Sequence, residues 1–204
     1  MCGRYTLKVD NGIYDRFSLD SSLKSLKNET KEFNVVPGEF MPIITYGSSH
    51  NQLSFMRWGL IPSWAKDDKI SKYLFNARSE TILEKPSFKT PFRRHRCLVP
   101  ANGFYEWKKE NGKSLPYFFT LKDTPLFSFA GIFDSWLDPN GSEYESYTII
   151  TTTPNALVKS IHHRMPVILG KEDEGKWLSP SSFPDKLTSL LQPYSSSLME
   201  VKKL

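Results

Sequence analysis

Cys2 has the most distinctive chemistry in this sequence because it directly follows Met1. Once Met1 is removed, the chain begins with an α-amine beside a thiol. The amine, with an ordinary pKa of about 7.7 to 8.0, is partly neutral near pH 7 and forms a Schiff base with an aldehyde. The thiol, whose ordinary pKa of about 8.5 is lowered by cationic neighbours such as Arg4, then closes a five-membered thiazolidine ring. From position alone, an incidental cysteine at a frayed terminus is the more common explanation.

Further motifs carry residues suited to proton transfer and to binding phosphate. They follow Met-Cys-Gly-Arg in the order Asn34-Val-Val-Pro-Gly38, Arg57-Trp-Gly-Leu-Ile-Pro-Ser-Trp64, Phe75-Asn-Ala-Arg-Ser-Glu80, Cys97-Leu-Val-Pro-Ala-Asn-Gly-Phe-Tyr-Glu-Trp107 and His162-His-Arg-Met-Pro166. Together they resemble the SRAP family, the SOS response-associated peptidases that are understood as abasic-site processing proteins. The resemblance covers residues 1 to about 177.

The resemblance implies a catalytic site of four residues. Cys2 matches the family nucleophile, which forms a thiazolidine crosslink to the ring-opened aldehyde of an abasic site. Glu106 matches a catalytic carboxylate that is also assigned the removal of Met1, and aromatic neighbours can raise its pKa by desolvation. His162 matches a histidine that helps to open the sugar, and Asn76 an asparagine that holds the amino-terminal residue or the sugar.

Each of these residues also has a purely structural explanation. Glu106 alternates with aromatic residues, which is the pattern of a surface residue on a half-buried strand. A single histidine is more often structural than catalytic, and His163 directly follows His162, so only the motif assigns the catalytic role to His162. We expect His163 to be exposed or to face phosphate, and Cys97 to be a buried core thiol.

The resemblance also implies contacts to DNA phosphates. Arg78 and Arg164 match arginines that clamp the phosphates flanking the lesion, and Arg4 is a weaker candidate. Guanidinium groups bind phosphate oxygens in pairs and stay charged. We place Thr151 with this set because it ends a predicted strand leading toward the histidine, where it would orient a water or the imidazole.

Apolar contacts to unpaired bases are implied at two positions. Pro37 and Trp64 lie where the family places wedge residues, although Ala65 stands where relatives can carry a second aromatic, which predicts a smaller stacking surface. Asn34 matches a residue that lines the pocket. A turn residue before Pro37 explains Asn34 equally well.

Basic residues are concentrated in one part of the chain. Residues 57–108 contain 11 Lys and Arg against 5 Asp and Glu, whereas the rest of the chain contains 16 against 17. The densest cluster is Pro91-Phe-Arg-Arg-His-Arg-Cys97, and aromatic residues nearby in sequence are Trp58, Trp64, Tyr73 and Phe75. Basic groups among aromatics suit a single nucleic-acid strand. For charge alone, a solvated face over ordinary core aromatics is the more common explanation.

The order of hydrophobic runs predicts the elements that position these residues. Runs rich in β-branched and aromatic residues predict strands at 42–46, 52–58, 103–108, 117–121, 126–133 and 144–152. Helical patterns occur at 11–19, 79–85, 155–161, 171–178 and 183–191. Thr153 followed by Pro154 predicts a helix N-cap, and residues 179–184 predict a loop. We therefore expect a single α+β domain over residues 1–204, built on a curled mixed or antiparallel β-sheet or barrel flanked by a few helices.

Composition excludes several classes of protein. A chain of 204 residues, with 39% hydrophobic and 14% aromatic residues, buries one sizeable core but is short for two domains. The apolar runs of a membrane helix and of a secretory signal are missing, so we expect a cytoplasmic protein with no membrane partner. Two cysteines without zinc-type spacing predict neither a disulfide framework nor a metal, and no cofactor is expected. We further expect a monomer, encoded by a bacterium or phage and associated with the nucleoid in use.

Three functions follow from these residues. The first is a DNA-repair enzyme, with Met1 removed by the chain itself or by an aminopeptidase, that traps abasic sites in single-stranded DNA by lyase-like Schiff-base and thiazolidine chemistry, shielding the lesion. The second is a cysteine peptidase that acts in trans through Cys2, Glu106 and His162, although the sequence reveals no subsite for a second substrate. The third is a non-catalytic module that binds single-stranded DNA, which the motif positions of Glu106, Asn76 and His162 disfavour.

Overall fold

A closed ring of five strands forms the centre of the fold. The computed structural model describes residues 2–20 and 31–204. The strands of the ring are β3 (Phe40–Thr45), β4 (Gln52–Trp58), β6 (Arg96–Ala101), β9 (Phe127–Leu137) and β10 (Glu143–Thr152). They pair in the order β10-β4-β3-β6-β9, and β9 pairs with β10 again, so that the sheet closes into a small barrel. Only the β10–β4 pairing of the ring is parallel. Closure removes free sheet edges from the ring.

Three short strands extend the ring at the end of β10 and beside β9. They are β5 (Asn76–Arg78), β11 (Met165–Pro166) and β12 (Ile168–Leu169). β5 runs parallel to β10 and places Arg78 opposite Thr151, while β11 places Pro166 opposite the same threonine from the other side. The last residues of β10 are therefore flanked by two segments that are distant in sequence.

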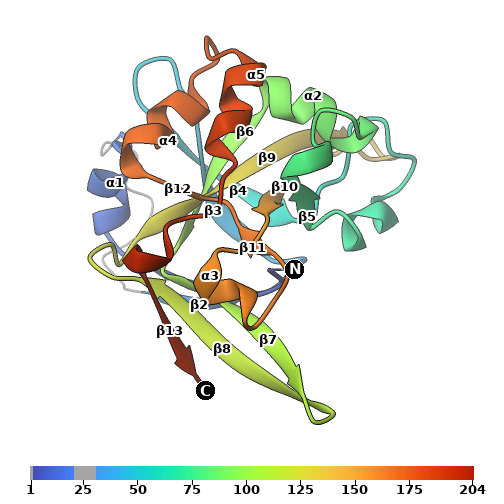
Figure 1. The fold of residues 1–204 in the computed structure, drawn as a ribbon. Coiled ribbons are helices and arrows are strands. Elements are labelled where there is room, and N and C mark those ends of the chain that lie inside the picture. Colours follow the sequence, from blue (N-terminus) through green and yellow to red (C-terminus); the bar gives the residue numbers. More distant parts are fainter. Residues whose placement is uncertain (1, 21–30) are drawn as a thin grey trace.

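A second, antiparallel sheet lies beside the ring. Its strands are β1 (Tyr5–Val9), β2 (Lys31–Val35), β7 (Gly103–Glu110), β8 (Lys113–Leu121) and β13 (Met199–Lys203), in the order β13-β8-β7-β1-β2. β7 and β8 form a hairpin whose tip projects away from the rest of the molecule, as Figure 1 shows. Gly112 has φ of 74° at this tip, a conformation that favours glycine in a tight hairpin turn.

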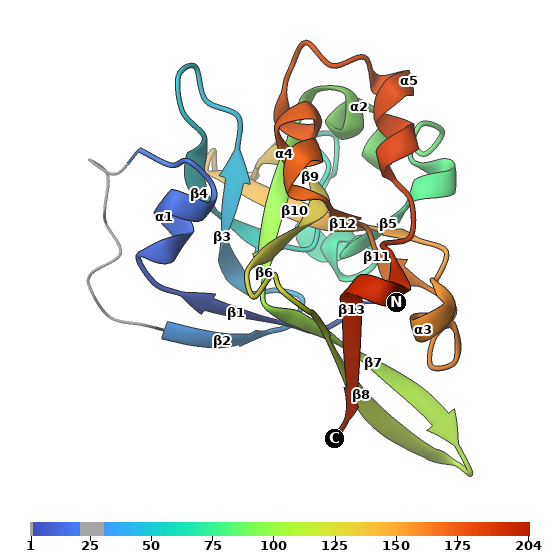
Figure 2. The same cartoon turned by 60° about the vertical axis from the view of Figure 1, so that its left-hand side comes forward.

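Short helices cover the ring. They are α1 (Gly12–Arg16), α2 (Pro86–Arg94), α3 (Ala156–Lys159), α4 (Lys171–Leu178) and α5 (Pro184–Leu187). In Figure 2, α2, α4 and α5 lie together above the ring, and α3 lies beside the β7–β8 hairpin. None of the described helices is long and apolar enough to cross a membrane.

Two clusters of buried side chains hold the layers together. One joins the ring to the second sheet: the rings of Trp58 and Tyr147 stack 6.3 Å apart, and the hydroxyls of Tyr5 and Tyr147 are hydrogen-bonded at 2.8 Å. The other joins the ring to the helices, where the rings of Phe92 and Trp177 meet at 5.7 Å. Each large apolar side chain buried in this way contributes about 1.5 to 3 kcal/mol.

The expected fold class is confirmed, and the curled sheet is closed. Every predicted strand is present, as are helices within residues 11–19, 155–161, 171–178 and 183–191, with the loop before the last of them. Within residues 79–85 the structure has only a 3-10 turn at Ser79–Thr81. The predicted N-cap at Thr153 is wrong: Asn155 caps α3, its side chain accepting a hydrogen bond from the amide of Val158 at 2.9 Å.

The densest basic cluster is not a continuous charged face. Its first residues end α2, and Arg96 is buried beneath that helix. The Arg96 guanidinium donates to the carbonyls of Phe92 and Arg93 at the end of α2, and to those of Trp177 and Ser179 at the end of α4. Arg96 thus satisfies carbonyls that a helix end leaves unpaired. Cys97 is a buried core thiol, as expected.

Candidate active site

Cys2 is buried beside β5, although its place at the start of the sequence suggests a frayed terminus. The backbone carbonyl of Cys2 accepts a hydrogen bond from the side-chain amide of Asn76 at 2.8 Å. Its thiol faces the carbonyl oxygen of Arg4 at 3.9 Å. Asn76 is itself buried at the start of β5, which the parallel pairing with β10 holds in place. The amino-terminal residue is therefore fixed by an element of the barrel. Met1 lies outside the described residues.

Asn76 has spare hydrogen-bonding capacity at this point. Its Nδ2 donates to Cys2, whereas its Oδ1 is buried and has no hydrogen-bond partner among the described residues. A buried carbonyl oxygen without a partner costs roughly 1 to 3 kcal/mol. An acceptor kept free at this cost beside Cys2 is suited to an N–H or O–H that arrives during the reaction.

The thiol of Cys2 is held in its protonated form. Burial raises the pKa of Cys2 far above its ordinary value, and the neighbouring Glu106 carboxylate raises it further. The expected lowering by the Arg4 cation is not found, because that guanidinium lies over the ring of Trp107, 5.6 Å from its centroid. A thiol in this state needs a base before it can act as a nucleophile.

Glu106 provides a carboxylate close enough to the Cys2 thiol to raise its pKa, and is the candidate for such a base. It lies on β7 with its side chain 3% exposed, and its Oε1 is 3.6 Å from Nδ1 of His162. Burial raises the pKa of Glu106 to about 7. The group is therefore divided between its acid and base forms near neutral pH, as a proton carrier requires.

His162 lies on the loop after α3 and faces Glu106. Its Nδ1 is 3.1 Å from both the amide nitrogen and the carbonyl oxygen of Arg164, so either protonation state of Nδ1 has a backbone partner. Burial lowers the pKa of His162, which favours the neutral imidazole. His163 is exposed and its ring lies 4.4 Å from that of His162.

Arg164 is buried and already paired. Its guanidinium forms two hydrogen bonds with the carboxylate of Glu80, at 2.5 and 2.9 Å, and a third with the carbonyl oxygen of Thr151 at 2.6 Å. Thr151 in turn donates its hydroxyl to the carbonyl of Ala77 at 3.4 Å. This pairing fixes the backbone whose N–H and C=O contact His162. A phosphate contact by Arg164 stays a prediction and would compete with Glu80.

The other residues expected to contact DNA lie outside this buried group. Arg78 is exposed at the end of β5. Pro37 is exposed before the turn at Gly38, and Asn34 is exposed within β2, so the turn explanation of Asn34 is wrong. Trp64 is 57% exposed, in contrast with Trp58 in the core. The structure brings Cys2, Asn76, Glu106 and His162 together, whereas Arg78, Pro37, Asn34 and Trp64 are exposed outside this group.

Trp64 is exposed, yet the backbone on both sides of it is anchored. The amide of Ile61 donates to the hydroxyl of Ser146 at 2.7 Å, and the amide of Ser63 donates to the carboxylate of Asp134 at 2.8 Å. After Trp64, the carbonyl of Ala65 accepts from the indole of Trp136 at 2.7 Å. We call residues 61–65 the Trp64 loop. Its three anchors come from β9 and β10 of the barrel.

A groove of about 1050 Å³ opens beside Glu106 and His162. One wall is the β7–β8 hairpin and the other is the segment from the end of β10 through α3 to His163. Lys108 and Lys109 line the first wall and Lys159 lines the second. The described residues contain no group of three or more His, Cys, Asp and Glu able to hold a metal.

Comparison with known proteins identifies the family. The whole chain, residues 1–204, matches the SOS response associated peptidase (SRAP) family. It is 46% identical over 203 residues to the abasic site processing protein YoqW of Bacillus subtilis, covering 98% of this chain and 90% of that protein. This chain belongs to the SRAP family. The abasic site processing protein HMCES of Gallus gallus is 43% identical over 163 residues, covering 68% of this chain and 48% of that protein.

The fold is also that of a solved structure. A crystal structure of a protein from Bacteroides thetaiotaomicron superposes with a TM-score of 0.90 at 36% identity, covering 100% of this chain and 92% of that one. The two structures thus share one fold over the whole of this chain, including the segments that carry the SRAP motifs.

Sequence reasoning missed several residues of this SRAP site. Glu80 ends one of the motifs, but the sequence predicts no role for it, and only the contact to Arg164, 84 positions away, gives it one. Lys109 and Lys159 lie outside the stretch in which basic residues are concentrated, so local charge density did not mark them. Lys108 and Lys109 could have been found from the sequence, because they directly follow the Glu106 motif on the same strand.

Proposed function

We propose that this chain senses abasic sites in single-stranded DNA and binds them covalently. The amine and thiol of Cys2, after removal of Met1, form a thiazolidine with the aldehyde of the lesion and shield it from strand scission. The observation that carries this proposal is the buried Cys2, held by Asn76 beside the Glu106–His162 pair. The relatives named abasic site processing proteins support the same substrate.

The first step joins the amine to the sugar. An abasic deoxyribose must open from its cyclic hemiacetal, which moves a proton from the C1′ hydroxyl to the ring oxygen. Neutral His162 and Glu106, with their shifted pKa values, are placed to transfer that proton. The Cys2 amine then attacks C1′, and loss of one water gives the imine. The free Oδ1 of Asn76 is an acceptor for the N–H of Cys2 as it reacts.

The second step closes the ring. The thiol of Cys2 adds to the imine carbon, forming the S–C1′ bond, while the thiol proton ends on the former imine nitrogen. Because the thiol is protonated at rest, the Glu106 carboxylate takes this proton and returns it to nitrogen. The five-membered ring contains the nitrogen, Cα, Cβ and sulfur of Cys2 with C1′. No proton is gained or lost overall in this addition.

Glu106 also serves in the removal of Met1. A carboxylate whose pKa lies near 7 activates water for attack on the Met1 carbonyl, and the released amine is that of Cys2. One cleavage per chain accounts for the peptidase in the family name. It requires no subsite for a second peptide.

The exposed residues around the centre bind the strand. Arg78 binds a phosphate, with Arg4 as a weaker contributor, and Trp64 stacks on a base beside the lesion. Pro37 and Asn34 line the path, and Arg164 and Thr151 support His162 from behind. The chain acts as a monomer in this scheme.

Intact-mass measurement of the purified chain, with and without a single-stranded oligonucleotide that carries one abasic site, tests the proposal. We expect a chain that has lost Met1 and an adduct with the summed mass of protein and DNA less one water. Cys2→Ala should give no adduct. An equal yield of adduct from Cys2→Ala would overturn the proposal.

The same preparation separates the two alternatives. A peptidase in trans would turn over added peptides and lose that activity in Glu106→Gln. A binding module would bind intact and abasic strands with equal affinity and give no adduct.

A further inference from the structure

The groove beside Glu106 and His162 has a proposed role other than binding the lesion itself. We infer that it carries the phosphate backbone of the DNA strand on one side of the lesion only, with Lys108 and Lys159 as the residues that bind it. The inference rests on the proposed function, because it takes the position of the lesion from Cys2, Glu106 and His162.

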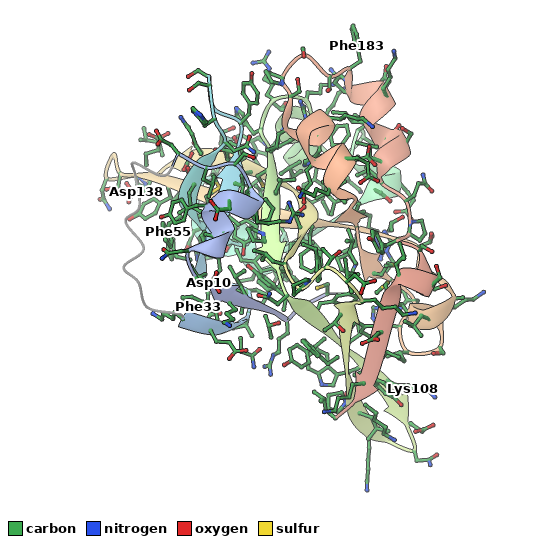
Figure 3. The ribbon with its side chains drawn as sticks, turned by 90° about the vertical axis from the view of Figure 1, so that its left-hand side faces the viewer. Asp10, Phe33, Phe55, Lys108, Asp138 and Phe183 are labelled. Atoms are coloured by element: carbon green, nitrogen blue, oxygen red, sulfur yellow. The ribbon has the colours of Figure 1, made fainter. Side chains whose placement is uncertain are left out.

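Each wall of the groove presents a catalytic residue and a lysine. On the hairpin, Glu106 and Lys108 are two positions apart on β7, so their side chains point to the same face of the strand. On the other wall, Lys159 ends α3 just before the loop that carries His162, whose amide donates to the carbonyl of Val158 at 2.9 Å. Figure 3 shows Lys108 on the hairpin, away from the body of the molecule.

The positive charge of the groove is poorly compensated. Lys108 has an ion pair with Glu110 at 3.4 Å, but both side chains are exposed, and such pairs are worth little in water. No acidic partner is found for Lys109 or Lys159 within residues 2–20 and 31–204. Of the described lining residues, Glu106 alone is acidic. Lysines that project from opposite walls offer mobile point charges, which bind phosphates without reading sequence.

The strand cannot use this groove on both sides of the lesion if it also passes the Trp64 loop. That loop is anchored by Trp136, two positions before Asp138. In Figure 3, Asp138 and Lys108 lie at opposite sides of the molecule. The end of β9 that anchors the Trp64 loop and the hairpin that carries Lys108 thus lie at opposite sides, and in this scheme one flank of the strand runs toward Trp64 and the other into the groove.

Binding to strands with an unreactive tetrahydrofuran analogue of the abasic site tests this arrangement. Three oligonucleotides are needed: one with flanks on both sides of the analogue, one with only a 5′ flank and one with only a 3′ flank. Their dissociation constants are measured over a range of salt for the wild-type chain and for Lys108→Ala/Lys159→Ala. The matched control is Lys171→Ala/Lys186→Ala, which removes two exposed lysines from α4 and α5.

We expect the groove variant to bind the two-flank strand about tenfold more weakly at moderate salt, with a salt slope smaller by about 1.4, as for two lost phosphate contacts on a single strand. The same loss should occur with one of the single-flank strands and not with the other. The control variant should bind all three strands as the wild type does.

Two results would overturn the inference: an equal loss on both single-flank strands, which indicates a general field effect, or no loss on any strand. Failure of the proposed function would look different. In that case the wild-type chain would form no adduct with a true abasic strand, whatever the lysine variants do.

Discussion

The proposed catalytic centre, which is buried, and the exposed Trp64 loop, which we propose stacks on a base, are built in opposite ways. In the centre, side chains are buried with shifted pKa values, and an acceptor of Asn76 is unpaired among the described residues. In the loop, the side chain of Trp64 is exposed while the backbone amides and carbonyl around it are hydrogen-bonded to the barrel. Proton transfer needs groups that are not yet satisfied, whereas base stacking needs a ring whose position is already fixed.

The two regions should differ in what they cost the stability of the fold. A carboxylate kept in a dry site lowers the stability of the fold, because burial disfavours its charged form. Asp134, an anchor of the Trp64 loop, is also a buried carboxylate, but its desolvation is outweighed by hydrogen bonds from His95 and Ser63, which lower its pKa, so it carries no comparable cost. Substitutions in the centre should therefore affect rate most, and those in the loop should affect affinity.

The largest effect is expected from Cys2→Ser, which keeps the amine and loses the thiol. Ring closure through sulfur is abolished, so the stable adduct disappears, but the imine still forms. Denaturing electrophoresis with and without borohydride measures the difference. We expect no adduct without the reductant and a trapped adduct with it. A stable adduct of Cys2→Ser without borohydride would show that the thiol is dispensable and break the assignment of the centre.

The next effect is expected from Glu106→Gln, which keeps the shape of the side chain and removes its proton transfer. Single-turnover crosslinking, with chains from which Met1 has been removed beforehand, should slow by roughly 10² to 10⁴-fold. Wild-type rates should rise with pH through about 7, where Glu106 becomes a base, and the variant should lose that titration.

Glu110→Gln is the matched control for this rate, because Glu110 is an exposed glutamate on the same strand. It should crosslink at the wild-type rate with an unchanged pH profile. A titration near pH 7 that survives in Glu106→Gln would belong to another group.

A smaller effect of Glu106→Gln is expected on the free energy of unfolding. Here the substitution is favourable, whereas it slows crosslinking. The pKa of Glu106 is about 7 in the fold and about 4.3 in the unfolded chain. Between these values the folded chain binds more protons, so its stability falls as the pH rises and stays lower above pH 7. Glu106→Gln removes this loss. Urea unfolding should show the variant more stable than wild type by on the order of 1 to 3 kcal/mol at pH 8, and by little near pH 4.5.

The difference in unfolding free energy from the wild type should depend on pH for Glu106→Gln and not for Glu110→Gln. An advantage of equal size at both pH values would trace to packing and not to a buried carboxylate. The claim that the buried centre lowers the stability of the fold, in contrast with the Trp64 loop, would then fail.

The sequence predicted strands where β-branched and aromatic runs are long, and missed β1, β2 and β6 as well as strands that form mainly through pairing. β5 has three residues and forms because β10 lies beside it, and β13 is a charged strand at a sheet edge. Motifs supplied Cys2, Asn76 and Glu106 together, but burial and pKa depend on the assembled core. That Cys2 is held as a neutral thiol, and not activated by Arg4, could not be read from residues two positions apart.

The smallest effect is expected in the Trp64 loop. Asp134→Ala leaves the amide of Ser63 without its partner and frees the ring of Trp64. Loss of Trp64 itself should cost about 1 to 3 kcal/mol of stacking, and Asp134→Ala should lose part of that, about three- to tenfold in affinity for an unreactive abasic analogue. The crosslinking rate at saturating DNA should not change, since Cys2 and Glu106 are untouched.

A double-mutant cycle distinguishes positioning from general damage. If Asp134 acts through Trp64, Asp134→Ala should weaken binding much less in a Trp64→Ala background than in the wild type. Quenching of 2-aminopurine beside the analogue reports stacking directly and should fall in Asp134→Ala. Asp134→Asn, which keeps an oxygen for the Ser63 amide, should restore both affinity and quenching. Additive losses in affinity would mean that Asp134 does not position the ring of Trp64, and that the anchors of the loop only stabilise the barrel.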